Sequence, residues 1–199
     1  MTTVTTRLRH KTPAQRPRRL SLASFLARPE SPGRIEELLD GELVVSPSAN
    51  ESHSRISTEL AMQLGAQFKA KRLGRLYGTP LTTVLDDRNA PEPDLSAILA
   101  ARTDIVQAGF PRGAPDLAIE VLSPSNKDND LIRKKRLYAA HGVREYWIVD
   151  GDAETVTRYW LRNGRYGKSE TRHRSIRLRI LPQVRVDLMA IWRTLRPAR

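Results

Sequence analysis

The sequence predicts an α/β fold with a mixed β-sheet. Two nearly apolar segments, residues 117–122 and 145–150, have the length and composition of buried strands. Between them, residues 130–141 have the pattern of a helix, and Gly142 follows at the point where that helix would end. The order strand, helix, strand is that of a βαβ unit, which indicates an α/β class.

The predicted elements on either side of this unit are short strands and one long helix. Before it they are a helical or extended lead-in over 35–39, strands over 42–46, 76–85 and 93–99, a helix over 52–72, and a loop or short helix over 101–113. After it they are hairpin strands over 155–161 and 175–180 and a short helix that ends near residue 195. The turn signal Asp40-Gly41 precedes the first strand. The long helix is predicted from apolar residues at a helical period: Ile56, Leu60, Met62, Leu64 and Phe68.

The composition is that of a basic globular protein. The chain has 199 residues, which suits one domain, and a net charge of +12. Cysteine is absent, which excludes a disulfide scaffold, a zinc ribbon, a thiol nucleophile and an iron–sulfur site. No apolar stretch approaches the length of a membrane span, and the N-terminus has no apolar core of a signal peptide. We therefore expect a cytoplasmic protein without a membrane partner.

The N-terminal arm, residues 1–19, is predicted to be disordered, and residues 20–199 are predicted to form a single domain. Residues 1–20 contain six basic residues and no acidic residue. A basic chain attracts nucleic acid because neutralising phosphates releases counterions. Both a nucleic-acid contact and a solvated tail that only aids solubility stay open for this arm.

Acidic residues next to apolar runs are the most informative feature. Glu120 lies within a nearly apolar strand, Asp94 directly precedes an apolar run, and Asp116 stands at the start of the Glu120 strand. Burying a carboxylate costs several kcal/mol unless it is paired or binds a metal. Carboxylates that converge from neighbouring strands form a hard oxygen site for Mg²⁺ or Mn²⁺, which activates water for phosphodiester cleavage. The competing interpretation is that each acid pairs with one of the 34 Lys and Arg residues.

The helix after the Glu120 strand carries two adjacent lysines, Lys134 and Lys135. A lysine that leans back toward the strand end could orient the attacking water or stabilise charge on a phosphate. The alternative is a pair of solvated lysines on a basic helix. Tyr138 follows Lys134 by four residues and lies on the same helix face, where its hydroxyl could reach a polar partner from the core.

Six sequence blocks occur in a characteristic order along the chain. They are Asp40-Gly-Glu-Leu-Val-Val-Ser-Pro, His53, Pro93-Asp-Leu, Ala114-Pro-Asp-Leu-Ala-Ile-Glu-Val-Leu-Ser-Pro-Ser, Lys134 with Tyr138, and Gly142-Val-Arg-Glu-Tyr-Trp-Ile-Val-Asp. In this the chain resembles the Uma2 family of the PD-(D/E)XK nuclease superfamily, over residues 22–192. The resemblance implies a restriction-endonuclease-like fold, with a mixed central sheet flanked by helices, here with a C-terminal β-hairpin region. It also implies a metal-dependent nuclease site.

The resemblance implies roles for three residues. Asp94 matches the family's aspartate, Glu120 its strand glutamate and Lys134 its helix lysine, so that Asp94 and Glu120 would hold Mg²⁺ or Mn²⁺. The superfamily pattern places lysine two residues after the strand acid, where this chain has Leu122. The resemblance therefore implies that Lys134, or Lys135 in its place, supplies the ammonium group from the following helix.

Three further residues have open roles. His53 matches a family histidine and either hydrogen-bonds a site carboxylate, contacts substrate or is an ordinary histidine at a helix start. In this superfamily an acid of the first helix often lends a further metal contact, and either Glu42 or Glu59 could do so.

The leading hypothesis is a metal-dependent endonuclease that hydrolyses nucleic acid, with DNA favoured over RNA. One alternative is a non-catalytic nucleic-acid-binding protein on the same fold, which Leu122 favours. A weaker one is a metal-dependent phosphodiesterase of a small nucleotide. A homodimer would suit cleavage of two strands, with residues 155–195 as the candidate interface.

Overall fold

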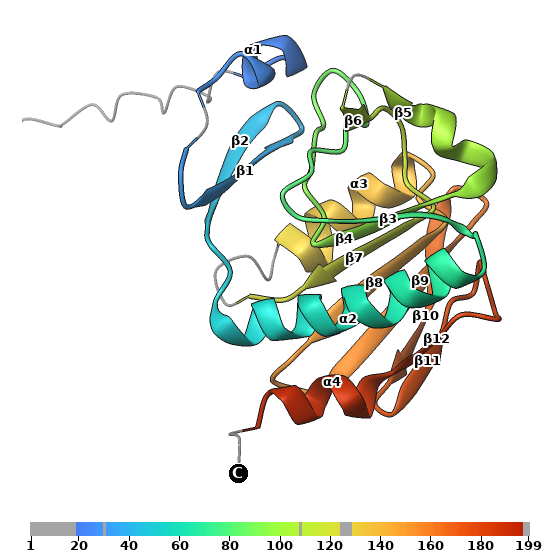
Figure 1. Ribbon diagram of the computed structural model, residues 1–199. Helices are drawn as coiled ribbons and strands as arrows, with labels where there is room; N and C mark the ends of the chain where they lie inside the picture. The colour runs from blue at the N-terminus through green and yellow to red at the C-terminus, as the bar shows by residue number, and fades with distance from the viewer. Residues whose placement is uncertain (1–18, 30, 108, 124–128, 197–199) are drawn as a thin grey trace, which may run out of the picture.

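The computed structural model describes residues 19–29, 31–107, 109–123 and 129–196. Its centre is a six-stranded mixed sheet with the strand order β10-β9-β8-β7-β4-β3 (Figure 1). The strands are β3 (Gly74–Gly78), β4 (Leu95–Leu99), β7 (Leu117–Val121), β8 (Glu145–Asp150), β9 (Thr155–Arg162) and β10 (Arg165–Arg172). Strands β7 and β8 are parallel and the other neighbours are antiparallel. The predicted mixed sheet with a βαβ unit is confirmed.

Helices cover both faces of this sheet. Helices α2 (Glu51–Ala70) and α4 (Leu188–Thr194) lie over one face, and the π-helical turn η2 (Asn129–Lys134) and helix α3 (Lys135–Ala140) lie over the other (Figure 1). Odd-numbered residues of β7 belong to the core cluster that includes α2, while Ala118 packs with the α3 side. Glu120 has the same parity as Ala118, so its side chain projects toward α3.

Helix α2 confirms the predicted helix and corrects one core residue. Asn50 caps its start, since the Asn50 side chain accepts a hydrogen bond from the backbone N–H of His53. The residues Ile56, Leu60, Leu64 and Phe68 are buried as predicted, at spacings of four residues. Met62 is 57% exposed because it falls outside this stripe.

An N-terminal hairpin packs beside the sheet. It consists of β1 (Arg34–Leu39) and β2 (Glu42–Pro47), preceded by the short helix α1 (Leu22–Leu26). The lead-in over 35–39 is therefore extended. Asp40 and Gly41 both have positive φ angles, 50° and 78°, which matches the predicted two-residue turn. Phe25, Leu38 and Ala90 form a small cluster that attaches this hairpin to the body.

Two predicted strands are wrong in part. Of the predicted strand 76–85, only residues 76–78 are in β3, which spans Gly74–Gly78. The chain then continues irregularly until Val84 forms a single bridge with Arg112. The predicted pairing of 155–161 with 175–180 does not occur. Strand β9 pairs instead with β10, because Asn163 and Gly164 adopt positive φ angles and close a tight turn directly after it.

The remaining segments are short. Residues 101–113 form the 3-10 helix η1 (Ala100–Ile105) and the two-residue strands β5 (Val106–Gln107) and β6 (Phe110–Pro111). Near the C-terminus, β11 (Ser175–Arg177) pairs with β12 (Arg185–Asp187) ahead of α4. The C-terminal hairpin region thus consists of two hairpins, β9–β10 in the main sheet and β11–β12 beside it.

The predicted disordered arm over 1–19 lies outside the described residues except for Arg19. Within the described ranges, no helix combines the length and apolar character needed to cross a bilayer.

Candidate active site

Asp94 and Glu120 meet because β4 and β7 are antiparallel neighbours. Leu95 is opposite Ile119 in this register, so the adjacent residues Asp94 and Glu120 are also opposite each other. Opposite side chains project from the same face of the sheet with Cβ atoms about 5 Å apart. Both residues are buried, with 7% of Asp94 and 2% of Glu120 exposed. The register of two strands therefore places two carboxylates side by side, as predicted.

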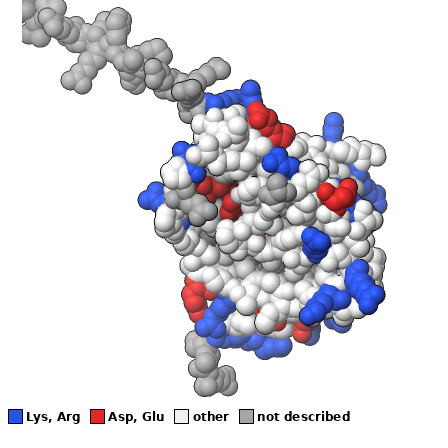
Figure 2. Space-filling view, turned by 45° about the horizontal axis from the view of Figure 1, so that its top comes forward, with Lys and Arg blue, Asp and Glu red and all other residues white. Residues whose placement is uncertain are grey.

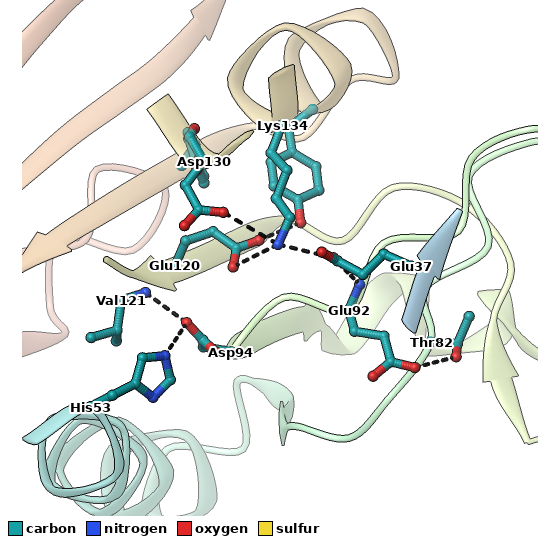
Figure 3. Close-up of polar contacts among 11 residues, drawn as sticks. Glu37, His53, Thr82, Glu92, Asp94, Glu120, Val121, Asp130 and Lys134 are labelled. Atoms are coloured by element: carbon teal, nitrogen blue, oxygen red, sulfur yellow. Dashed lines mark hydrogen bonds and ion pairs between the residues drawn. The ribbon is translucent and has the colours of Figure 1, made fainter. Parts of the chain in front are cut away.

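Asp94 is held by one of its two carboxylate oxygens. Oδ2 accepts a hydrogen bond from the backbone N–H of Val121 at 2.7 Å and lies 3.0 Å from Nε2 of His53, at the start of α2 (Figure 3). Burial alone would lower the pKa of His53, but the hydrogen bond and charge of Asp94 outweigh burial and raise it. Oδ1 of Asp94 has no hydrogen-bond partner within the described ranges, so this oxygen is available to a ligand. Of the interactions left open for His53, the hydrogen bond with a carboxylate is the one that the structure contains.

Glu120 has a partner on each oxygen. The Tyr138 hydroxyl donates to Oε1 at 2.7 Å, and Nζ of Lys134 is 3.1 Å from Oε2. Burial is the main reason that the pKa of Glu120 lies well above its ordinary value. The neighbouring carboxylates of Asp130, Asp94 and Glu37 add to this rise, and Lys134 opposes it. A further cation near Glu120 would favour its ionised form.

Lys134 lies at the centre of three carboxylates (Figure 3). Its Nζ is 2.9 Å from Glu37, 3.1 Å from Glu120 and 3.4 Å from Asp130. Burial alone would lower the pKa of Lys134, but the three carboxylates outweigh burial and hold it well above its ordinary value. Lys134 is therefore a fixed cation and is unsuited to act as a base.

The π-helical turn η2 sets the position of Lys134. Asp130 and Lys134 are four residues apart on it, and both side chains are buried. The hydroxyl of Tyr146 donates a hydrogen bond to the backbone carbonyl of Asp130 at 2.9 Å, which anchors the turn to β8. Single π-turns within helices are frequent at functional sites.

Arg133, the neighbour of Lys134, joins the same turn to the N-terminal hairpin. Its guanidinium donates to the backbone carbonyl of Leu39 and to Oε2 of Glu42, the latter at 2.9 Å. A third contact reaches Oδ2 of Asp40 at 3.4 Å. Two consecutive residues of η2 thus bind the N-terminal hairpin. Arg133 contacts the turn of the hairpin, and Lys134 contacts Glu37 on β1.

Asp94, Glu120 and Lys134 line one cavity of about 200 Å³. Its carboxylates are Glu37, Glu92, Asp94, Glu120 and Asp130, against the cation Lys134 and His53. Burial raises the pKa of Asp130 to about 6, with Lys134 opposing the rise. Figure 2 shows acidic side chains recessed in a hollow, with Lys and Arg side chains on the surrounding surface. The cavity therefore carries more carboxylates than its own cations neutralise.

Asp116 is not part of this cavity, although it was a candidate. It precedes Glu120 by four residues, which is about 13 Å along a strand. Asp116 is fully buried and contacts Arg102 at 2.9 Å and Arg144 at 3.2 Å, and it accepts a hydrogen bond from the backbone N–H of Leu99. Asp116 is therefore paired with arginine residues and does not belong to the predicted metal site.

Three further candidates lie outside the cavity. Glu42 binds Arg133, as described above. Glu59 faces along α2, where its Oε1 accepts a hydrogen bond from Nε2 of Gln63 at 3.0 Å. Lys135 points away from the carboxylates, and its Nζ lies 4.7 Å from the ring centre of Tyr159. Of the two lysines, Lys134 is the one that lies in the cavity.

Three cavity carboxylates were not predicted, namely Glu37, Glu92 and Asp130. Glu37 is 1% exposed, and its Oε1 also accepts a hydrogen bond from the backbone N–H of Glu92 at 2.8 Å. Oε2 of Glu37 is buried without a hydrogen-bond partner among the described residues. Asp130 could have been found from the sequence, because residues four apart on a helix share a face with each other. Glu37 had no such signal, since its contact depends on how the hairpin packs.

The oxygen donors of Asp94 and Glu120 fit a divalent cation. Mg²⁺ is commonly held by one or two carboxylates together with water and substrate phosphates. Two carboxylates face each other here, one with an uncommitted oxygen. Among the described residues there is no group of three or more Asp, Glu or His side chains that could by itself hold a metal ion. The arrangement suits a cation that shares its coordination with substrate.

A mixed six-stranded sheet with helices on both faces is the architecture expected of the restriction-endonuclease-like class of α/β proteins. The chain belongs to the Uma2 family, described as "Putative restriction endonuclease", which matches residues 22–189.

The chain is similar to the solved structure of a "putative nuclease belonging to DUF820" from Anabaena variabilis ATCC 29413. Its TM-score is 0.75 at 22% sequence identity, and the match covers 88% of this chain and 99% of that chain. At this identity the likeness supports the fold. A search of curated proteins finds no significant match.

Proposed function

We propose that the protein is a metal-dependent endonuclease that hydrolyses phosphodiester bonds of nucleic acid, with DNA as the favoured substrate. The observation that carries this proposal is the pairing of Asp94 with Glu120 in a cavity that also holds the cation Lys134. The family description and the similar nuclease structure support the same reaction class.

The contacts of each cavity residue indicate its proposed role in the reaction. Asp94 and Glu120 would hold Mg²⁺ or Mn²⁺, which when bound supplies Lewis acidity and activates water. His53 and the Val121 N–H fix Oδ2 of Asp94, which leaves Oδ1 directed to the ligand. Tyr138 fixes Oε1 of Glu120. Such partners orient coordinating oxygens and typically change affinity or activity about 10–100-fold when removed.

Lys134 provides positive charge where a phosphate becomes more negative. Its pKa is raised, so its ammonium group stays protonated and can stabilise the transition state or orient the water. Lys134 comes from the helix after the Glu120 strand and replaces the lysine that the superfamily has two residues after the acid. Leu122 at that position packs against the α3-side core cluster. In this proposal Lys134 compensates for Leu122, the residue that favours the alternative of a binding protein without activity.

The test is cleavage of plasmid DNA, a single-stranded oligonucleotide and RNA in Mg²⁺ or Mn²⁺. Wild type is compared with Asp94→Asn and Glu120→Gln, and with Asp104→Asn as a control at an exposed acid of η1. We expect metal-dependent cleavage that falls at least about 10³-fold in both site variants and is unchanged in the control.

Other outcomes contradict the proposal. Salt-sensitive binding without cleavage of any substrate indicates the non-catalytic binding protein. Cleavage of bis(p-nitrophenyl) phosphate without cleavage of any polynucleotide indicates a small-molecule phosphodiesterase. Cleavage that persists in Asp94→Asn places the active site elsewhere.

A further inference from the structure

A second hollow lies on another flank of α3, with the opposite charge character. It has a volume of about 290 Å³ and is bounded by α3 and the tip of the β9–β10 hairpin. Its basic residues are Lys135, Arg136 and Arg165, and its lining includes no aspartate or glutamate. We call these three cations with their apolar floor the basic groove.

The floor of the basic groove is formed by small and aromatic residues. Ala139 and Ala140 leave the flank of α3 bare, and Tyr166 forms an aromatic wall. The Tyr166 hydroxyl donates to the backbone carbonyl of Val143 at 2.8 Å, and its ring stacks on Tyr146 with centres 6.1 Å apart. These contacts hold the ring in place. The groove is open because the two alanines have small side chains and the Tyr166 ring is fixed beside them.

The cations of the basic groove are not neutralised by their surroundings. None of the three forms an ion pair with any residue in the described part of the chain. By contrast, Arg133 and Lys134 on η2 bind five acids between them. The segment 155–196, which includes the hairpin, contains eleven Lys and Arg residues and two acidic residues. The groove thus lies beside the most basic part of the described chain.

We propose that the basic groove binds the phosphate backbone of a nucleic-acid strand next to the nucleotide that occupies the acidic cavity. Cations beside an aromatic and apolar floor are the usual composition of surfaces that bind single-stranded nucleic acid. Lys135 and Arg136 follow Lys134 by one and two residues. A helix with its side chains is about 10 Å wide, so the groove is within a few nucleotides of the cavity at 3.4 Å per nucleotide of a duplex strand. This inference rests on the proposed nuclease function and adds the surface that holds the substrate outside the cavity.

The test uses the double variant Arg136→Ala/Arg165→Ala in the full chain. Binding of a labelled 20-nucleotide single strand is measured by fluorescence anisotropy in EDTA, which prevents cleavage, over a range of salt concentrations. Because two phosphate contacts are lost, we expect the Kd to rise about tenfold and the slope of log K against log salt to shrink by about 1.5. In Mn²⁺ the variant should have a raised KM and an unchanged kcat at saturating substrate.

The control removes two exposed cations from the opposite side of the sheet, in the variant Lys69→Ala/Arg193→Ala. It should keep the wild-type Kd and salt slope, and both variants should melt at the wild-type temperature. If Kd and salt slope change equally in the two variants, or in neither, the groove does not bind the nucleic acid and this proposal is wrong. The nuclease proposal still holds in that case if wild type cleaves its substrate. If only the binding of polyglutamate depends on Arg136 and Arg165, the groove serves an acidic protein segment and the proposal is wrong. Absence of both binding and cleavage in wild type contradicts the nuclease function itself.

Discussion

Lys134 and Lys135 are consecutive residues with opposite surroundings, and they mark the boundary between the acidic cavity and the basic groove. Lys134 is buried against Glu37, Glu120 and Asp130, whereas Lys135 lies over the ring of Tyr159 in a groove without carboxylates. Successive residues of a helix point about 100° apart, so one short helix can serve both regions. Lysine is thus a buried, fixed charge at position 134 and a partly exposed charge at position 135.

The difference shows what the local charge balance permits. The cavity has surplus carboxylates and is suited to a divalent cation, and the basic groove has surplus cations and is suited to phosphates. A metal-dependent nuclease needs both, since the substrate is a polyanion and the carboxylates alone would repel it. Substitutions in matched pairs across the boundary are the sharpest way to test this division.

The largest expected effect is on stability, from Lys134→Met compared with Lys135→Met. Removal of the Lys134 ammonium leaves three buried carboxylates without their cation, so we expect the free energy of unfolding to fall by about 3–5 kcal/mol. Lys135→Met removes a cation–π contact at a partly exposed site and should cost no more than about 1 kcal/mol. Urea denaturation monitored by tryptophan fluorescence measures both. Equal losses would contradict the distinction between the two lysines.

A smaller effect is expected from Glu37→Gln compared with Glu36→Gln. Glu37 contacts Lys134 from within the cavity, whereas its neighbour Glu36 contacts Ser31 and Arg28 on the other side of β1. Because Glu37 positions Lys134, we expect kcat for cleavage to fall about 10–100-fold with little change in KM. Glu36→Gln should keep wild-type kcat. A raised KM without a lower kcat in Glu37→Gln would show that Glu37 acts on substrate binding instead.

The smallest effect is expected from Tyr138→Phe compared with Tyr159→Phe. The Tyr138 hydroxyl donates to Glu120, while the Tyr159 hydroxyl has no hydrogen-bond partner among the described residues. Loss of the Tyr138 hydroxyl should therefore lower the free energy of unfolding by about 1–2 kcal/mol, and loss of the Tyr159 hydroxyl should leave it within about 0.5 kcal/mol. Thermal unfolding of the two variants gives this difference. A larger cost at Tyr159 than at Tyr138 would be inconsistent with the contacts described.

The sequence predicted the central part of the fold and of the site because both depend on local signals. The apolar strands around Glu120 and residues 145–150, the helix between them and the Asp40-Gly41 turn were visible from periodicity and turn residues. Asp94, Glu120 and Lys134 were predicted as candidates because acids beside apolar runs are rare and because the chain resembles the Uma2 family. The structure brings these three together.

What the sequence did not reveal depends on packing between distant segments. Glu37 reaches Lys134 only because the hairpin docks through Leu38 and Ala90, which are 52 residues apart in the chain. Asp116 resembled a site acid because its strand contains Glu120, and only the three-dimensional arrangement shows that Arg102 and Arg144 pair with it. The β9–β10 pairing was missed because β10 is an edge strand of mostly polar residues, which lacks an apolar alternation.

The most direct test of the central claim is titration of the full chain with Mn²⁺ by isothermal calorimetry, comparing wild type with Asp94→Asn and with the control Asp104→Asn. We predict that wild type and the control bind Mn²⁺ with the same affinity and that Asp94→Asn binds it at least tenfold more weakly. Equal Mn²⁺ affinity in wild type and Asp94→Asn would contradict the assignment of Asp94 and Glu120 as the metal site.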